Sequence, residues 1–284
     1  MASIKNPGIL YLVGTPIGNL EDITLRAIRI LKEADLIAAE DTRHTLRLLN
    51  HLGISKPLVS FHKNNWRSRI ERLLTVLRKG KSVALVTDAG MPGISDPGAE
   101  MVPAAKKAGI VVVPVPGPSA VITAVAASGF PAERFAFLGF LPRSGKERAG
   151  FLNEIAVAGH TVVFFEAPQR IIKTLEDLGK VCGGRRIALA RELTKIHEEF
   201  QTGYAEELLA AYQGRKPRGE FTVLVEGRAK DKSPGGARGE SLGKVENLVR
   251  QGVKIADAVK RVARDDRTDR RDLYREAVKR LLNR

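Results

Sequence analysis

Short apolar runs alternate with segments of helical period along most of the chain, and this alternation restricts the fold more than any other feature of the sequence. Residues 8–14 (GILYLVG) form an apolar run typical of a buried strand. In segment 22–34 the apolar residues recur at three- and four-residue spacing, as on one face of a helix. Further strand-like runs, each set apart by a helical or turn segment, lie at 35–40, 58–62, 82–87 and 110–115. This order predicts a parallel α/β sheet covered by helices on both faces.

A second series of strands and helices begins after residues 135–143. Helical patterns occupy 146–156, 169–179 and 205–212, and strand-like runs occupy 160–167, 186–193 and 220–227. We therefore predict two α/β domains, residues 1–140 and 141–228, that meet near residues 140–145.

The C-terminal fifth of the chain differs in composition from the rest. Residues 229–241 are rich in Gly, Pro, Ser and charge and predict a linker. Residues 242–284 hold three short helical patterns, the last with Tyr274, Ala277, Val278 and Leu281 on one face. Such a set predicts a small helical module related to helix-turn-helix domains.

Positive charge is concentrated in the same region. The chain has a formal net charge of +15, and residues 228–284 hold 17 Lys and Arg against 9 Asp and Glu. An excess of this kind indicates a polyanionic partner, with nucleic acid ahead of an anionic membrane surface. A basic surface that only contacts solvent is the alternative.

Composition excludes several classes of protein. Cys182 is the single cysteine, so an intrachain disulfide and an all-cysteine zinc site are excluded, which suits a reducing cytoplasm. The five histidines lack metal-ligand spacing, and we predict no metal site. No apolar run has the length of a bilayer span, so we expect a cytoplasmic protein without a membrane partner.

Three loops rich in glycine and proline follow strand-like runs: 14–19 (GTPIGN), 87–98 (TDAGMPGISDPG) and 114–120 (PVPGPSA). In parallel α/β sheets ligands bind at the carboxyl ends of the strands, where these loops are expected. Asp88 and Asp96 would repel a phosphate and suit hydroxyl or amino groups of a ligand. The GxGxxG fingerprint is absent, and residues 139–146 depart from the phosphate-binding loop in spacing and lack its Ser or Thr.

Several stretches resemble the tetrapyrrole (class III) methyltransferase superfamily and, within it, the branch that methylates small-subunit ribosomal RNA. The resembling stretches are LYLVGTPIGNLEDITLRA, AAEDTRHT, SFHKNN, VTDAGMPGISDPG, PVPGPSA, FEAPQR, RELTKIHEEF and GEFTVLVEG, and the tail 253–278 resembles the C-terminal helical module of that branch. The resemblance implies the tetrapyrrole methylase fold, a cleft between the two domains that holds S-adenosylmethionine, and a homodimer. It also implies 2′-O-methylation of a cytidine ribose in the decoding region of 16S ribosomal RNA.

The resemblance assigns cofactor contacts to residues in the three loops and on strands of the second domain. The expected cofactor-binding residues are Thr15, Pro16, Asp88, Gly90, Met91, Pro92, Ser119, Ala120, Phe165, Ala190 and Thr222. Such a cofactor carries a sulfonium and an ammonium group and no phosphate, which agrees with the carboxylates of the long loop. Phe165 and Ala190 would alternatively be ordinary core residues.

Polar residues at strand ends are the candidates for RNA contact and catalysis. We expect RNA contacts from His62, Lys63, Asn64, Arg170 and Lys195 and catalytic roles for Asp41, Arg43 and Glu166. Asp41, Glu166, His62 or a lysine could remove the hydroxyl proton, or the proton could leave to water. Asp41 could instead cap the helix that follows it, and Glu166 and Arg170 could form an internal ion pair.

Two other functions stay open at this point. A methylase of a small tetrapyrrole fits the same loops but leaves the basic tail unexplained. A ribosome-assembly factor that binds RNA without catalysis explains the tail but leaves the intact 87–98 loop unexplained.

Overall fold

A computed structural model of the chain describes residues 8–96, 98–214, 216–228, 237–266 and 268–282. It divides into two compact units, residues 1–228 and 229–284, each of which has its own core. The larger unit holds two five-stranded sheets with their helices, so the predicted α/β class is confirmed.

The first sheet is parallel throughout, with strand order β3-β2-β4-β1-β5. Its elements are β1 (Ile9–Val13), α1 (Leu25–Glu33), β2 (Leu36–Ala39), α2 (Thr42–His51), β3 (Leu58–Ser60), α3 (Trp66–Arg78), β4 (Val83–Val86), α4 (Met101–Lys107) and β5 (Val111–Val115), with a short 3-10 turn at Leu20–Asp22. Val83 and Leu85 of β4 face the α3 and α4 side, and Ala84 and Val86 face the α1 side. Both faces are therefore covered, as the near-continuous apolar runs predict.

The second sheet is mixed, with order β6-β7-β10-β8-β9. Its elements are α5 (Ala120–Ser128), β6 (Phe135–Phe140), α6 (Gly145–Val157), β7 (Thr161–Glu166), the 3-10 turn Pro168–Arg170, α7 (Ile171–Val181), β8 (Ile187–Arg191), β9 (Glu199–Gly203), α8 (Ala205–Ala211) and β10 (Phe221–Val225). Only β6 and β7 pair in parallel, and β10 lies between β7 and β8, antiparallel to both.

The second sheet begins earlier than the expected boundary at residue 141. Strand β6 pairs with β7, and helix α5 packs its Val121, Ala124 and Val125 against this sheet rather than the first. The physical reason is the apolar face of α5, which the strands β7, β8 and β10 cover. The chain thus crosses from one sheet to the other at the loop before α5, near Ser119.

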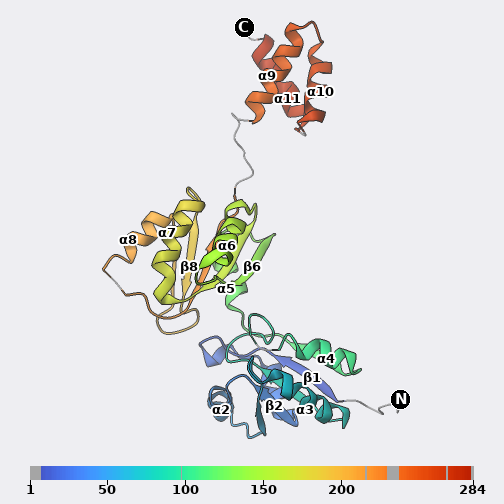
Figure 1. Cartoon of the computed structure of the whole chain (residues 1–284), viewed down its shortest axis with the longest axis vertical. Helices are drawn as coiled ribbons and strands as arrows, with labels where there is room; N and C mark the ends of the chain where they lie inside the picture. The colour runs from blue at the N-terminus through green and yellow to red at the C-terminus, as the bar shows by residue number, and fades with distance from the viewer. Residues whose placement is uncertain (1–7, 97, 215, 229–236, 267, 283–284) are drawn as a thin grey trace. The chain divides into compact units, whose positions relative to one another are not determined.

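The C-terminal unit is a three-helix module of α9 (Ala237–Arg250), α10 (Ile255–Asp265) and α11 (Arg270–Leu282) (Figure 1). Helix α9 begins at Ala237, inside the segment 229–241 that was expected to be a linker. Residues 229–236 of that segment lie outside the described residues. The expected face of the last helix was right for Ala277 and wrong for Tyr274, and it omitted Leu273. Leu273 and Ala277 are buried against the other helices, and Tyr274 is 46% exposed.

We predict that Gly117→Ala destabilises the larger unit by about 1–3 kcal/mol, the usual cost of inserting a methyl group into a packed site. An added Cβ would lie 2.8 Å from Gly14 Cα and 2.9 Å from Gly14 O, and both are backbone atoms. Urea unfolding measures the change. The matched control is Gly150→Ala in α6, where an added Cβ meets nothing within 4 Å. Because alanine is the better helix former, this control should gain roughly 0.5–1 kcal/mol. Equal stability of the two variants would contradict the prediction.

Candidate functional site

The three glycine- and proline-rich loops meet at the carboxyl ends of the adjacent strands β4, β1 and β5. Thr15 N donates to Gly90 O at 3.0 Å, and Gly90 N donates to Thr15 O at 3.1 Å. Gly90 has a φ of +77°, which favours glycine at this position. The bare backbone of Gly14 and Gly117 lets the first and third loops touch. The placement of these loops after strands of a parallel sheet predicted this convergence, and the structure confirms it.

These loops form one wall of a cavity of about 660 Å³, which we call the large cavity. The opposite wall comes from the second sheet. The lining residues are Ile17, Glu40, Asp88, Ala89, Gly90, Met91, Ile94, Asp96, Ser119, Ala120, Val121, Ile122, Phe137, Phe140, Phe165, Glu166, Ala167, Pro168, Ala190, Leu193, Glu220, Phe221 and Thr222. The volume lies in the range of ordinary small-molecule sites.

Most of the expected cofactor residues are among the lining residues. Asp88, Gly90, Met91, Ser119, Ala120, Phe165, Ala190 and Thr222 line the large cavity. Thr15, Pro16 and Pro92 are buried and are not among its lining residues. Thr15 Oγ1 donates to Thr87 O at 3.1 Å, so this side chain braces the first and second loops.

The large cavity has an aromatic side. The rings of Phe137 and Phe140 pack against Phe165 with centroid distances of 4.9 and 5.2 Å. The sequence pointed only to Phe165, because Phe137 and Phe140 are three residues apart, a spacing that places side chains on opposite faces of a regular strand. A register shift in β6 between them accompanies the contact of both rings with Phe165. Such a side suits a flat apolar ring of a ligand.

Its other side is acidic. Burial raises the pKa of the Asp96 carboxyl to about 6, and the charges of Glu40 and Asp88 add to the rise while Lys63 opposes it. Burial also raises the pKa of Glu40. Asp88 Oδ1 accepts from Asp41 N at 3.1 Å, and Asp88 N donates to Glu40 Oε2 at 3.5 Å. The charge of Asp88 contributes to the raised pKa of both Glu40 and Asp96. A cluster of carboxylates of this kind favours a cationic ligand.

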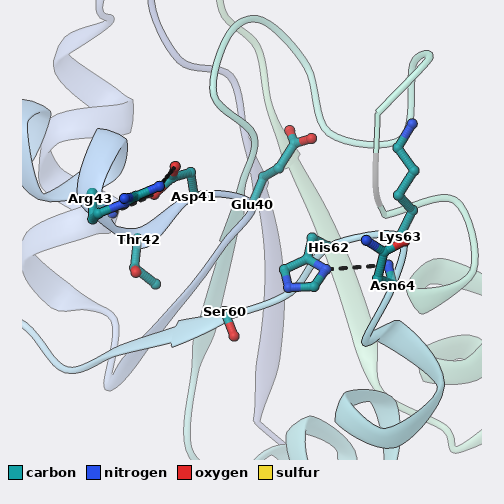
Figure 2. Close-up of a pocket in the computed structure, with 8 residues that line it drawn as sticks. All are labelled: Glu40, Asp41, Thr42, Arg43, Ser60, His62, Lys63 and Asn64. Carbon is teal, nitrogen blue, oxygen red and sulfur yellow. Dashed lines mark hydrogen bonds and ion pairs between the residues drawn. The ribbon is translucent and has the colours of Figure 1, made fainter.

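A second, smaller pocket of about 470 Å³ lies at the ends of β2 and β3 (Figure 2). We call it the small pocket; it is lined by Glu40, Asp41, Thr42, Arg43, Ser60, His62, Lys63 and Asn64. It brings together five of the residues that sequence analysis singled out for RNA contact or catalysis: Asp41, Arg43, His62, Lys63 and Asn64. Glu40 also belongs to it, and sequence analysis did not choose this residue.

Asp41 forms the N-cap of α2, as the alternative interpretation proposed. Its Oδ1 accepts from Arg43 N at 2.8 Å, and its Oδ2 pairs with Arg43 Nη2 at 3.1 Å. The hydrogen bonds from the Arg43 side chain and backbone lower the pKa of Asp41 to about 2. Arg43 itself is 88% exposed in its side chain, so its guanidinium stays accessible to an anion.

The segment after β3 is held by local hydrogen bonds. His62 Nδ1 accepts from Asn64 N at 3.2 Å, and Asn65 Nδ2 lies 3.1 Å from His62 Nε2. Asn65 also accepts from His62 N, at 2.9 Å. These contacts fix the imidazole and leave Lys63 and Asn64 exposed at the rim.

Glu166 and Arg170 form a buried ion pair within the second domain. Glu166 Oε1 lies 2.6 Å from Arg170 Nη2, and its other oxygen accepts from Thr174 Oγ1 at 2.6 Å. Arg148 Nη1 lies 3.9 Å from Glu166 Oε2, and the Glu166 side chain has no exposed surface. Arg170 also donates to Leu141 O at 3.0 Å. This network engages both carboxylate oxygens of Glu166, which also lines the large cavity, and agrees with the alternative interpretation of an internal ion pair.

Lys195 belongs to a loop that ties the two sheets together. Its Nζ pairs with Glu192 at 2.8 Å and Glu220 at 3.0 Å. In the same loop Thr194 Oγ1 accepts from Asn19 N at 3.1 Å, and the Lys195 side chain packs against Gly18. The loop therefore fixes the second domain to the first-domain loop at residues 14–19, on which Ile17 lines the large cavity.

Two absences concern the described residues. Within the described ranges, no helix has the length and apolar character that crossing a bilayer requires. In the same part of the chain, no three His, Cys, Asp or Glu side chains are grouped in a way that would hold a metal ion.

Comparison with known proteins gives consistent results. The family described as Tetrapyrrole (Corrin/Porphyrin) Methylases matches residues 9–209. The chain is similar to "Ribosomal RNA small subunit methyltransferase I" of Halalkalibacterium halodurans, with 48% identity over 94% of this chain and 93% of the relative. The relative of the same name from Thermotoga maritima is 51% identical over 78% of this chain and 99% of its own length.

Solved structures share the fold. A uroporphyrin-III-C-methyltransferase from Thermus thermophilus superimposes with a TM-score of 0.52 and 24% identity, over 77% of this chain and 94% of that one. A second structure, of the native form of the enzyme with that name from the same organism, gives a TM-score of 0.54 with 23% identity.

We predict that Asp88→Asn weakens binding of S-adenosylmethionine, the donor implied by the sequence resemblance, by about 10- to 100-fold. A charge-assisted contact of this kind is worth about 1.5–3 kcal/mol. Titration calorimetry measures the affinity. The matched control is Asp35→Asn, an exposed aspartate before β2 that bonds Ser82 and lies outside both cavities. Wild-type affinity in Asp88→Asn would contradict the placement of this carboxylate.

The raised pKa of Asp96 predicts that affinity for the same cationic ligand increases with pH. A bound cation favours the carboxylate form and lowers the pKa of Asp96 from about 6. Binding near pH 6 therefore releases a proton, and affinity should rise roughly tenfold between pH 5 and pH 7. Calorimetry in two buffers of different ionisation enthalpy counts the released protons. Asp96→Asn should remove most of this release; full proton release in that variant would contradict the assignment.

Proposed function

The chain belongs to the tetrapyrrole methylase family and, within it, to the group named ribosomal RNA small subunit methyltransferase I, and from that premise we propose that it transfers a methyl group from S-adenosylmethionine to RNA. The acceptor in our proposal is the 2′-hydroxyl of a cytidine ribose in 16S ribosomal RNA. The observation that carries the proposal is that two cavities lie next to each other and share Glu40 as a lining residue. The large cavity has acidic and aromatic sides, and the small pocket has exposed cations at its rim.

The large cavity suits the donor. Its carboxylates match the sulfonium and ammonium groups, and its aromatic side matches the adenine ring. Asp88 and Asp96 would hold the positive charges, and Phe165 with its two neighbours would hold the base. When bound, S-adenosylmethionine supplies an electrophilic methyl group. The loops around Gly90 and Gly117 hold this wall rigid and keep water away from the donor.

The small pocket suits a nucleotide. Arg43 and Lys63 are exposed cations at its rim, and Asn64 offers an amide to a ribose or base edge. Cations of this kind position an RNA through its phosphates and do not select its sequence. Our proposal therefore gives Arg43 and Lys63 a positioning role and gives no RNA contact to Arg170.

The C-terminal helical module would add affinity for the ribosomal particle. Its excess of Lys and Arg is suited to counterion release on RNA binding. The Thermotoga maritima relative is matched over nearly its whole length by 78% of this chain. A relative of that name thus has a shorter chain than this one.

The alternatives are less well supported. The solved uroporphyrin methyltransferases share only the fold at this level of identity, and a small tetrapyrrole would leave the cationic rim and the basic module without a partner. An assembly factor without catalysis would leave the acidic and aromatic walls of the large cavity unexplained. A homodimer in the cytoplasm remains a prediction from the family resemblance.

A methyl-transfer assay tests the proposal. Purified chain is mixed with labelled S-adenosylmethionine and small ribosomal subunits that lack ribose methylation, and the RNA is digested and analysed by mass spectrometry. We expect labelled 2′-O-methylcytidine at one position, and a rate about 10- to 100-fold lower with Asp88→Asn at a donor concentration below the wild-type Kd. Label on a uroporphyrinogen substrate alone would favour the tetrapyrrole enzyme. Absence of donor binding would favour the assembly factor.

A further inference from the structure

Glu40 occupies a position that no other described residue shares. It follows β2 directly, at the carboxyl end of a strand next to β4. Of the described residues that line the large cavity or the small pocket, Glu40 alone lines both. Figure 2 shows its side chain between the Asp41–Arg43 pair and the segment of His62, Lys63 and Asn64. A group that acts between a methyl donor and a ribose must touch both spaces, and this side chain does.

The other carboxylates near the two cavities and His62 are engaged elsewhere. Asp41 is paired with Arg43 and caps α2, and its lowered pKa makes it a weak base. Both ring nitrogens of His62 contact neighbouring Asn residues. Glu166 has no exposed surface and is bound to Arg170 and Thr174. Asp88 and Asp96 line the large cavity and not the small pocket.

Glu40 has a carboxylate that is nearly free. Among the described residues, its hydrogen-bond donor is Asp88 N at the long distance of 3.5 Å. Its oxygens are therefore available to a hydroxyl. The charged groups that face it are Asp88, Asp96, His62 and Lys63, from the loops after β4 and β3.

The environment also tunes this carboxyl toward proton transfer. Burial raises the pKa of Glu40; the hydrogen bond from Asp88 N lowers it, the charge of Asp88 raises it, and Lys63 and His62 lower it. A carboxyl whose pKa moves toward the working pH is a better general base.

We propose, on the premise of the proposed function, that Glu40 is the general base that removes the ribose 2′-hydroxyl proton. The hydroxyl oxygen forms the new O–C bond to the methyl carbon, and the O–H electron pair stays on that oxygen. The C–S bond breaks with its electron pair on sulfur, which becomes a neutral thioether. The proton passes to an Oε of Glu40, which becomes a neutral carboxylic acid and loses it to water when the product leaves.

Glu40→Gln is the first test, because it keeps the shape and the acceptor for Asp88 N and removes the basic oxygen. We expect kcat for ribose methylation to fall by about 100-fold or more, the usual contribution of a general base. Affinity for S-adenosylhomocysteine, measured by calorimetry without turnover, should stay within about threefold, since that ligand lacks the sulfonium charge. The matched control is Glu33→Gln, which makes the same change at an exposed residue paired with Arg29.

Chemical rescue and pH dependence distinguish a base from a structural residue. In Glu40→Ala, added formate should restore part of kcat, because it can enter the vacated space and accept the proton. Wild-type kcat should rise with pH and level off above the pKa of Glu40, since the base must be deprotonated. In Glu40→Gln this rise of kcat with pH should be absent. Thermal unfolding of each variant shows that it is folded.

The inference is overturned if folded Glu40→Gln keeps a kcat within tenfold of wild type, or if its loss is matched by an equal loss of S-adenosylhomocysteine affinity. The latter result would make Glu40 a donor-binding residue. A wild-type chain that forms no methylated ribose would instead overturn the proposed function, so the two failures are distinguishable.

Discussion

The backbone contact between Gly14 and Gly117 is the constraint on which the functional end of the first sheet depends. An added Cβ at either glycine would lie within 3 Å of the other's backbone. Their approach brings the loops after β1 and β5 together, and the paired hydrogen bonds of Thr15 and Gly90 add the loop after β4. Asp88, Met91 and Ser119 reach the same cavity only because these three loops are held at that distance. The chemistry of the site thus rests on residues that have no side chain.

The second domain supplies what the loops lack, which is an apolar surface and a fixed position. Helix α5 leaves the first sheet at Ser119 and buries its apolar face on β7, β8 and β10. The loop at Thr194 and Lys195 makes a second connection, through Asn19 and Gly18. These two connections between the domains bring the aromatic side chains of the second sheet and the carboxylates of the first-domain loops to the same large cavity. Asp96 and Glu40 both line this cavity, and their burial raises their pKa values.

The sequence was informative where local rules decide the structure and uninformative where distant pairing decides it. The period of apolar residues predicted the strands of the first sheet, and the glycine- and proline-rich loops after them predicted where a cavity lies. The ion pair of Glu166 with Arg170 was one of two interpretations open from the sequence, because the two residues are four positions apart. The burial of Glu166 and its contact with Arg148 of another helix depend on the packed domain and have no local signal. Glu40 was missed because it stands at the end of an apolar run, where alternation does not tell which space a side chain enters. The order of strands in the second sheet has no local signal, and so β6 was assigned to the wrong side of the boundary.

That strand order has a consequence for the synthesis of the chain. Strand β10 is the last to be made, yet it occupies the middle of its sheet, between β7 and β8. Until residue 225 has emerged, β7 and β8 have no common neighbour and each presents an open edge, while the apolar face of α5 has no complete surface to cover it. The first sheet has no such dependence, since its strands are complete at Val115. During synthesis the first sheet is therefore complete while the second still has open, aggregation-prone strand edges. More than a hundred residues are translated between the end of β5 at Val115 and the end of β10 at Val225.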